Sequence, residues 1–126
     1  SAMEGPVGRC GLEATLDMIG GKWKPIILWR LRLSDATLRF GELRRLAAGV
    51  SEKVLAQQLR EMARDGLVSR RDFGEVPPRV EYALTDLGVS LSEALRPLCE
   101  WGRVHGEAMA GAFQAPPCEV RSGEGE

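Results

Sequence analysis

Residues 50–85 read VSEKVLAQQLREMARDGLVSRRDFGEVPPRVEYALT, and this stretch joins a helical pattern to a strand–turn–strand pattern. At 100° per residue, the aliphatic side chains of residues 51–65 fall on one side of a helix. The opposite side carries the long polar side chains Lys53, Gln57, Arg60 and Arg64. Ser51 is a favoured N-cap and Gly66 a favoured residue after a helix end, so we expect a helix at residues 51–65.

A hairpin is expected directly after this helix, at residues 67–84. Val80, Tyr82 and Leu84 alternate with other residues in the way that is typical of a half-buried strand. Residues 74–78 join the two strands and contain two prolines, which stiffen the tip and cannot extend the ladder. A helix followed by a hairpin is the order of a winged helix-turn-helix, so the sequence predicts an α+β fold of this class.

The rest of the chain supplies further helices, because apolar residues recur at helical spacing around residues 10–19, 23–33, 40–48 and 85–110. Gly49 and Ser51 leave only a tight turn between the third and fourth helices. We therefore expect one winged-helix domain at residues 10–112. Residues 1–9, which begin with Ser1-Ala2 like a tag remnant, are expected to be flexible, and the Pro-, Gly- and Glu-rich residues 113–126 to be disordered.

Charge is distributed unevenly along the chain, although the net charge of the 126 residues is only −1. Residues 22–79 contain 13 Lys/Arg and 7 Asp/Glu, a local charge of +6. Residues 1–21 carry −2 and residues 80–126 carry −5. A basic middle between acidic ends indicates a local face that binds a polyanion.

The composition argues against a membrane-spanning protein and against a disulfide-rich secreted protein. The hydrophobic fraction of 44% and the charged fraction of 28% are ordinary for a globular domain, and no apolar run is long enough to span a membrane. Three cysteines at irregular spacing favour a reducing compartment over a disulfide framework. We expect a cytoplasmic protein without a signal peptide, associated with the nucleoid through DNA.

Long amide and guanidinium side chains at the start of a helix can pair with the edges of adenine or guanine. On this basis Lys53, Gln57 and Arg60 are the expected base contacts of residues 51–65, whereas Arg64 is the expected phosphate contact. A solvated charged face is the simpler alternative for these four residues. The full set of expected DNA contacts is Arg39, Ser51, Lys53, Gln57, Arg60, Arg64, Arg70 and Arg79.

Arg79 follows the rigid Pro-Pro pair and is the preferred contact of the wing with a phosphate or the minor groove. The arginines that bracket the wing have an alternative role, since they could pair across the strands with acidic residues. These arginines are Arg70, Arg71 and Arg79, and the acidic candidates are Asp72, Glu75 and Glu81.

No group of residues indicates an active site or a cofactor. His105 is the only histidine, and Cys99, His105 and Cys118 lack the spacing of a metal site. The aromatic residues Trp23, Trp29, Phe40 and Trp101 could line a ligand pocket, although aromatics at helical spacing more often belong to a core. We therefore expect no enzyme, no metal and no cofactor.

Cys10 precedes the first predicted helix, where unpaired backbone amides favour a thiolate, and Arg9 is adjacent. A small buried hydrophobe is the alternative role for this cysteine. The residues alone leave both roles open.

Several segments together resemble the HxlR-type winged-helix regulators of bacteria, relatives of the MarR-like dimeric repressors. The resemblance covers roughly residues 10–105, in the segments CGLEATLDMIGGKW at 10–23, RFGELRRL at 39–46, VSEKVLAQQLR at 50–60, DGLVSR at 65–70, EVPPRVEYALT at 75–85 and LCEWG at 98–102.

This resemblance implies a homodimer built from the terminal helices, which presents two recognition helices to a pseudo-palindromic operator and regulates a nearby gene. The expected dimer contacts are Leu12, Leu16, Leu91, Leu95, Leu98 and Trp101. In several members a cysteine before the first helix senses oxidants or electrophiles, and Cys10 occupies that place. Cys118 has no counterpart in the family.

Two alternatives stay open at this point. The winged helix could bind a protein without binding DNA, or a small-molecule ligand could control the regulator in place of a thiol. A thiol enzyme built on Cys10 is disfavoured, because the sequence places no base near it.

Overall fold

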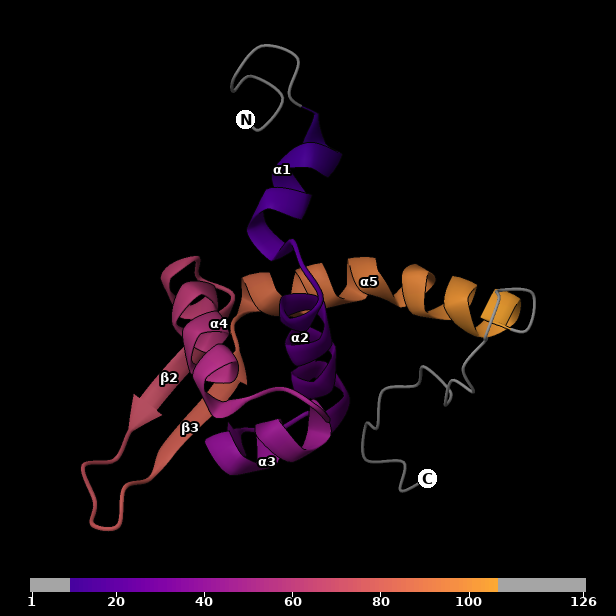
Figure 1. Ribbon diagram of the computed structural model, residues 1–126. Helices are drawn as coiled ribbons and strands as arrows, with labels where there is room; N and C mark the ends of the chain where they lie inside the picture. Colours follow the sequence, from indigo (N-terminus) through magenta and orange to yellow (C-terminus); the bar gives the residue numbers. More distant parts are fainter. Residues whose placement is uncertain (1–9, 107–126) are drawn as a thin grey trace.

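The computed structural model describes residues 10–106 and has the α+β winged-helix architecture that the sequence predicts (Figure 1). The helices are α1 (Gly11–Ile19), α2 (Trp23–Ser34), α3 (Phe40–Leu46), α4 (Glu52–Arg64) and α5 (Asp86–His105). The strands are β1 (Leu38–Arg39), β2 (Val68–Asp72) and β3 (Val80–Leu84). The expectations for residues 1–9, for the tail at 113–126 and for the last helix beyond residue 106 lie outside the described residues.

The sheet has three strands in the order β1-β3-β2, all antiparallel, where the sequence predicted a two-stranded hairpin. β2 and β3 pair from Val68↔Leu84 to Asp72↔Val80, and β1 adds the pairs Leu38↔Tyr82 and Arg39↔Glu81. Two residues are too few to show the alternating pattern of a strand, so β1 is recognised only by its pairing with β3. The segment between the second and third helices, for which no element was predicted, therefore ends in a strand.

The core lies between α2, α3, α4 and the sheet. Ile27 and Leu28 of α2 are fully buried, as are Leu43 of α3 and Leu55 of α4. Met62 and Leu67 complete the contact between α4 and the start of the hairpin. This packing buries one side of α4 and leaves the other in solvent.

The segment α3–turn–α4 is the helix-turn-helix. α3 ends at Leu46, two residues before the predicted limit, and Gly49 has a φ of 97°, a left-handed conformation that glycine adopts without steric cost. The Ser51 hydroxyl accepts the N–H of Val54 at 3.1 Å, which confirms the predicted N-cap of α4.

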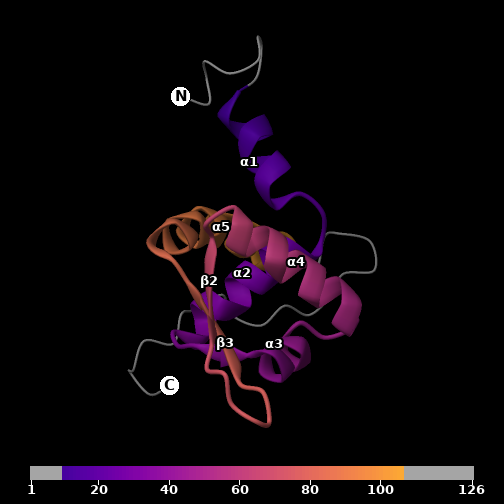
Figure 2. The ribbon, with the colours of Figure 1, turned by 90° about the vertical axis from the view of Figure 1, so that its left-hand side faces the viewer.

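α1 and α5 extend away from this body. Both views show α1 pointing outward, and Figure 1 shows the C-terminal half of α5 running past the other helices (Figures 1 and 2). Within the described residues, no helix is both long and apolar enough to cross a membrane.

Candidate nucleic-acid interface

The solvent face of α4 carries the residues that the sequence predicted as base contacts. Lys53, Gln57 and Arg60 are exposed, as is Arg64 one turn further on. The opposite face is anchored, because Leu59 is almost completely buried in the core. A capped helix with one fixed side and one polar side presents long donors in a defined direction.

The wing lies beside this helix. Figure 2 shows α4 in front of α2, with the β2–β3 hairpin extending below it. Gly74 N donates to Asp72 Oδ1 at 2.9 Å and Phe73 N donates to Arg79 O at 3.0 Å, so hydrogen bonds order the wing beyond its strands. The hairpin and α4 together form the candidate interface.

Arg79 is held within the wing by two carboxylates. Its guanidinium donates twice to Glu81 Oε2, at 3.0 and 3.2 Å, and lies 3.8 Å from Glu75 Oε2. The pKa of Glu81 lies below its usual range, chiefly because of the hydrogen bonds from Arg79. A phosphate would therefore compete with these carboxylates for Arg79.

Phe73 lies between two arginines of the wing. The guanidinium carbons of Arg71 and Arg79 lie 4.3 and 4.1 Å from the centre of its ring, within the range of cation–π attraction. Arg70 lies in the middle of β2, with Nη2 3.8 Å from Asp72 Oδ2 at the end of that strand. Arg79 thus pairs with Glu75 across the wing tip and with Glu81 two residues further along its own arm of the hairpin. Arg70 pairs within its own strand, whereas the residue opposite Glu81 in the register is Arg71.

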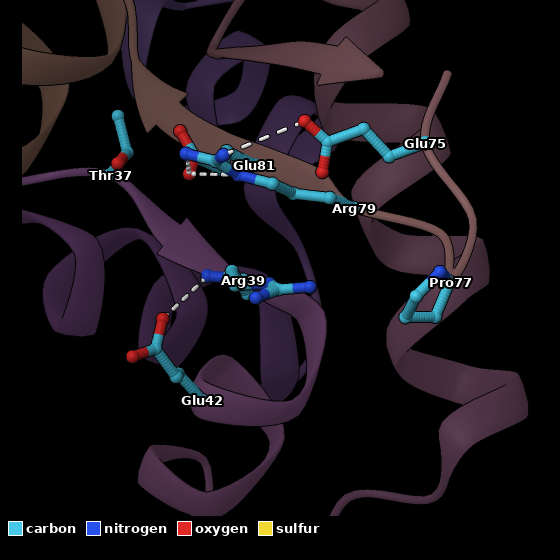
Figure 3. Close-up of a pocket in the computed structure, with 7 residues that line it drawn as sticks. All are labelled: Thr37, Arg39, Glu42, Glu75, Pro77, Arg79 and Glu81. Carbon is cyan, nitrogen blue, oxygen red and sulfur yellow. Dashed lines mark hydrogen bonds and ion pairs between the residues drawn. The ribbon is translucent and has the colours of Figure 1, made fainter. Parts of the chain in front are cut away.

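Arg39 and Arg79 line one open groove of about 490 Å³ between β1, the start of α3 and the wing (Figure 3). Arg39 Nη2 donates to Pro78 O at 3.3 Å, and the Glu42 carboxylate accepts Arg39 N at 2.8 Å. The groove also contains Glu42, Glu75 and Glu81, so its two guanidiniums face three carboxylates. This mixed lining is suited to fixing the wing against α3 more than to holding a small anion.

A second pair of cations lies on α3, and the sequence analysis did not single it out. Arg44 and Arg45 line a groove of about 580 Å³ beside the N-terminus of α4. Arg44 donates to Glu52 Oε2 at 3.0 Å and to Val50 O at 3.3 Å, which connects α3 to the first turn of α4. Their charge and the helical spacing of residues 40–48 could have indicated this pair from the sequence, and both arginines are exposed.

Cys10 is the N-cap of α1 and is exposed. Its backbone N–H donates to Glu13 Oε1 at 3.2 Å, so the acidic residue of the first turn accepts the N–H of the N-cap. Arg9, the cationic neighbour in the sequence argument, lies outside the described residues. Residues 10–106 of one protomer therefore do not bury Cys10.

The predicted dimer contacts divide into two groups. Leu91 and Leu95 are half-buried and pack against the core of their own domain. The others are exposed to solvent, with 65% of Leu12, 51% of Leu16, 69% of Leu98 and 57% of Trp101 accessible. An apolar surface therefore covers the outer parts of α1 and α5.

Comparisons with known proteins identify this arrangement. The family model of the HxlR-like helix-turn-helix matches residues 18–110. The chain belongs to this family.

One curated relative and two solved structures support the assignment to the HxlR family. The uncharacterized HTH-type transcriptional regulator YkvN of Bacillus subtilis (strain 168) is 45% identical over 98 residues, which are 78% of this chain and 81% of YkvN. The structure of the redox regulator HypR in its reduced form is 38% identical, with a TM-score of 0.73 over 81% of this chain and 99% of the HypR chain. Diamide-treated YodB from B. subtilis is 28% identical, with a TM-score of 0.60 over 75% of this chain and 93% of its own.

Membership of the HxlR family makes this chain a transcriptional regulator and not an enzyme. Among residues 10–106 no group of His, Cys, Asp and Glu has the geometry of a metal site. Of the four aromatics considered for a pocket, Trp23 and Phe40 pack against the core, Trp29 lies under Arg96, and Trp101 stacks on His105 near the end of α5. Cys99 is disulfide-bonded and Cys10 is free, which corrects the expectation that the cysteines form no disulfide. Cys118 lies outside the described residues.

Proposed function

We propose that this HxlR-family regulator binds double-stranded DNA sequence-specifically as a homodimer, with α4 in the major groove and the wing beside it. The solvent face of α4 carries the proposal, because it presents Lys53, Gln57 and Arg60 from a helix whose other side is buried. Side chains of this length reach base edges in the major groove.

The remaining cations have positioning roles in this proposal. Ser51 and Arg64 contact phosphates from the two ends of α4, and Arg70 contacts the backbone from β2. Arg39 and Arg79 act from the groove beside the wing, where Arg79 exchanges its carboxylate partners for a phosphate or the minor groove. These contacts set register and salt dependence without reading sequence.

The dimer forms through the outer parts of α1 and α5. Leu12 and Leu16 on α1, with Leu98 and Trp101 on α5, supply the exposed apolar surface, and Leu91 and Leu95 support it from the domain core. A two-fold dimer would place its two α4 helices about one DNA turn apart, at roughly 34–36 Å, and would bind a pseudo-palindromic operator.

Modification of Cys10 by an oxidant or an electrophile switches the affinity for DNA in this proposal. Two observations support it. Cys10 is exposed at the start of α1, which also carries the exposed Leu12 and Leu16. The fold is similar to that of a redox regulator known in reduced and oxidized forms. A small-molecule effector acting elsewhere is the alternative signal, and no described cavity favours one.

Titration with matched and scrambled duplexes at several salt concentrations tests the DNA-binding function. Duplexes selected from a randomised library by the wild-type protein serve as the matched probe. Gln57→Ala should reduce the difference in binding free energy between the preferred base and the other bases by about 1–3 kcal/mol at one position of each half-site. Arg64→Ala should weaken all duplexes alike and flatten the salt dependence.

The same titration separates DNA binding from a protein-interaction module. A winged helix that binds only protein would show no salt-dependent affinity for any duplex. If Lys53, Gln57 and Arg60 can all be replaced by Ala with the affinity for the selected duplex unchanged, α4 is not the recognition helix.

A further inference from the structure

Lys24 is a buried cation on the second residue of α2, with only 9% of its surface exposed. Its Nζ lies 2.6 Å from Oε1 of Glu61, which lies on α4. The Glu61 side chain is 27% exposed, so the pair is buried on the lysine side only. A buried ammonium is costly without a partner, and apolar side chains of the same volume would avoid that cost. Stability alone therefore gives no reason for a charged pair between these two helices.

The second oxygen of the same carboxylate faces the recognition surface. Gln57 Nε2 donates to Glu61 Oε2 at 3.3 Å, one helical turn along α4. The pKa of Glu61 lies below its usual range because of the hydrogen bonds from Lys24 and Gln57, so the group is ionised at neutral pH. An ionised carboxylate only accepts hydrogen bonds.

This restriction decides which way the amide of Gln57 is turned. The two ends of a glutamine amide look alike in shape, and only the hydrogen-bond partner distinguishes nitrogen from oxygen. Because Glu61 can only accept, the nitrogen of Gln57 must face it and the amide oxygen must face away. Lys24 fixes the other oxygen of Glu61 and so holds the carboxylate in place.

We propose that Glu61, held by Lys24, is a positioning residue that turns the amide oxygen of Gln57 toward the DNA and thereby sets its preference for adenine over guanine. The inference rests on the proposed DNA-binding function. In the major groove adenine offers an N6 donor and an N7 acceptor, which match the amide oxygen and the remaining N–H of Gln57. Guanine offers two acceptors, O6 and N7, and the oxygen of Gln57 would face them.

A purely structural role for the ion pair makes a different prediction. If Lys24 and Glu61 only hold α2 against α4, their replacement should lower stability and weaken every duplex by the same factor. A positioning role changes the ranking of bases at one position of each half-site. The base profile therefore separates the two roles.

The decisive variant is Glu61→Gln, because it keeps the size of the side chain. Lys24 still requires an acceptor, so the new amide oxygen remains with Lys24 and the new amide nitrogen faces Gln57. Gln57 must then turn its own oxygen inward and present its nitrogen to the DNA. A nitrogen with two N–H groups suits guanine, so the preference for adenine should be lost or inverted.

The test measures the relative affinity of all single-base variants of a duplex selected from a randomised library by the wild-type protein. The wild type should prefer adenine over guanine by about 5- to 150-fold at the position facing Gln57. Glu61→Gln and the apolar pair Lys24→Met/Glu61→Leu should reduce this ratio to near one or below. The salt dependence should stay as in the wild type, since no phosphate contact has changed.

Glu93→Gln is the matched control, because Glu93 pairs with Arg32 of α2 at 3.1 Å but belongs to α5. It loosens α2 without touching α4 and should leave the base profile unchanged. Thermal unfolding confirms that each variant is folded, and Glu61→Gln alone decides if the apolar pair does not fold.

A wild-type base profile in Glu61→Gln, with an altered profile in Gln57→Ala, would overturn the positioning role and leave DNA binding intact. An unaltered profile in Gln57→Ala would also overturn it, since Gln57 would then read no base. A wild-type protein without salt-dependent affinity for any duplex would refute the proposed function, and the inference with it.

Discussion

Gly88 of α5 lies so close to the carbonyl oxygen of Leu67 that a Cβ on Gly88 would overlap it. The same corner is fixed by Thr85, whose hydroxyl accepts Gly88 N at 3.0 Å and donates to Gly66 O at 2.6 Å. The start of the long helix is therefore seated directly on the start of the hairpin. Only a residue without a side chain allows this approach.

Gly88→Ala should lower the free energy of unfolding by about 1–3 kcal/mol, because the backbone of α5 or β2 must shift to admit the methyl group. Urea unfolding monitored by circular dichroism measures the change. Gly41→Ala on α3 is the control, since a Cβ there would meet only Arg45 Nη1 at 3.8 Å. That variant should gain about 0.5–1 kcal/mol, and equal effects of the two substitutions would contradict the close seating of α5.

Sequence patterns predicted the helices well because their limits depend on local chemistry. Ser51 caps α4 as the sequence predicted, and Thr85, where the last predicted helix begins, caps α5. Each cap accepts the N–H of the residue three positions further along. β1 was missed because its existence depends on Leu38 pairing with Tyr82, far along the chain. A short segment carries no trace of such a distant partner.

The candidate interface was predicted in part for the same reason. Helical spacing identified the polar face of α4, yet it could not show that Gln57 shares Glu61 with a lysine of α2. Helical spacing also predicted the apolar residues of the last helix. It could not show that Leu95 packs on the core of its own domain while Leu98 is exposed. Both distinctions come from how the helices cross.

Replacing Leu98 by Glu should convert the proposed dimer to a monomer, because the charge would enter an apolar surface shared by two copies. Sedimentation velocity at micromolar concentration measures the assembly state. Leu87→Glu is the matched control, since Leu87 is 51% exposed at the other end of α5 and should tolerate the charge. A dimer that persists in Leu98→Glu would place the interface elsewhere.

Acid should destabilise the protein through its paired carboxylates. The hydrogen bond from Arg96 holds the pKa of Glu93 below its usual range, with Arg32 adding to the effect. A carboxyl with a lowered pKa in the folded state stabilises the fold above its unfolded pKa of about 4.3 and loses this contribution as the pH falls. Glu93→Gln should therefore show a shallower loss of stability below that pH in urea unfolding series, and an unchanged acid slope would contradict the pairing.

Modification of Cys10 should change DNA affinity, because Cys10 begins α1 and α1 carries part of the exposed apolar surface. A bulky adduct there would re-space the two α4 helices of a dimer, and both half-sites must be engaged together. A coupling of about 5- to 150-fold in affinity is expected for two sites linked in this way. The measurement is operator affinity before and after treatment with a maleimide, which needs only one thiol and forms one carbon–sulfur bond.

Two variants isolate the thiol responsible. Cys99→Ser/Cys118→Ser leaves Cys10 as the sole cysteine and should respond to maleimide as the wild type does. Cys10→Ser should keep wild-type DNA affinity and lose the response. If Cys10→Ser responds as strongly as the wild type, the signal enters through another cysteine. If the protein with Cys10 alone is fully labelled and binds DNA unchanged, Cys10 is an exposed residue without a regulatory role.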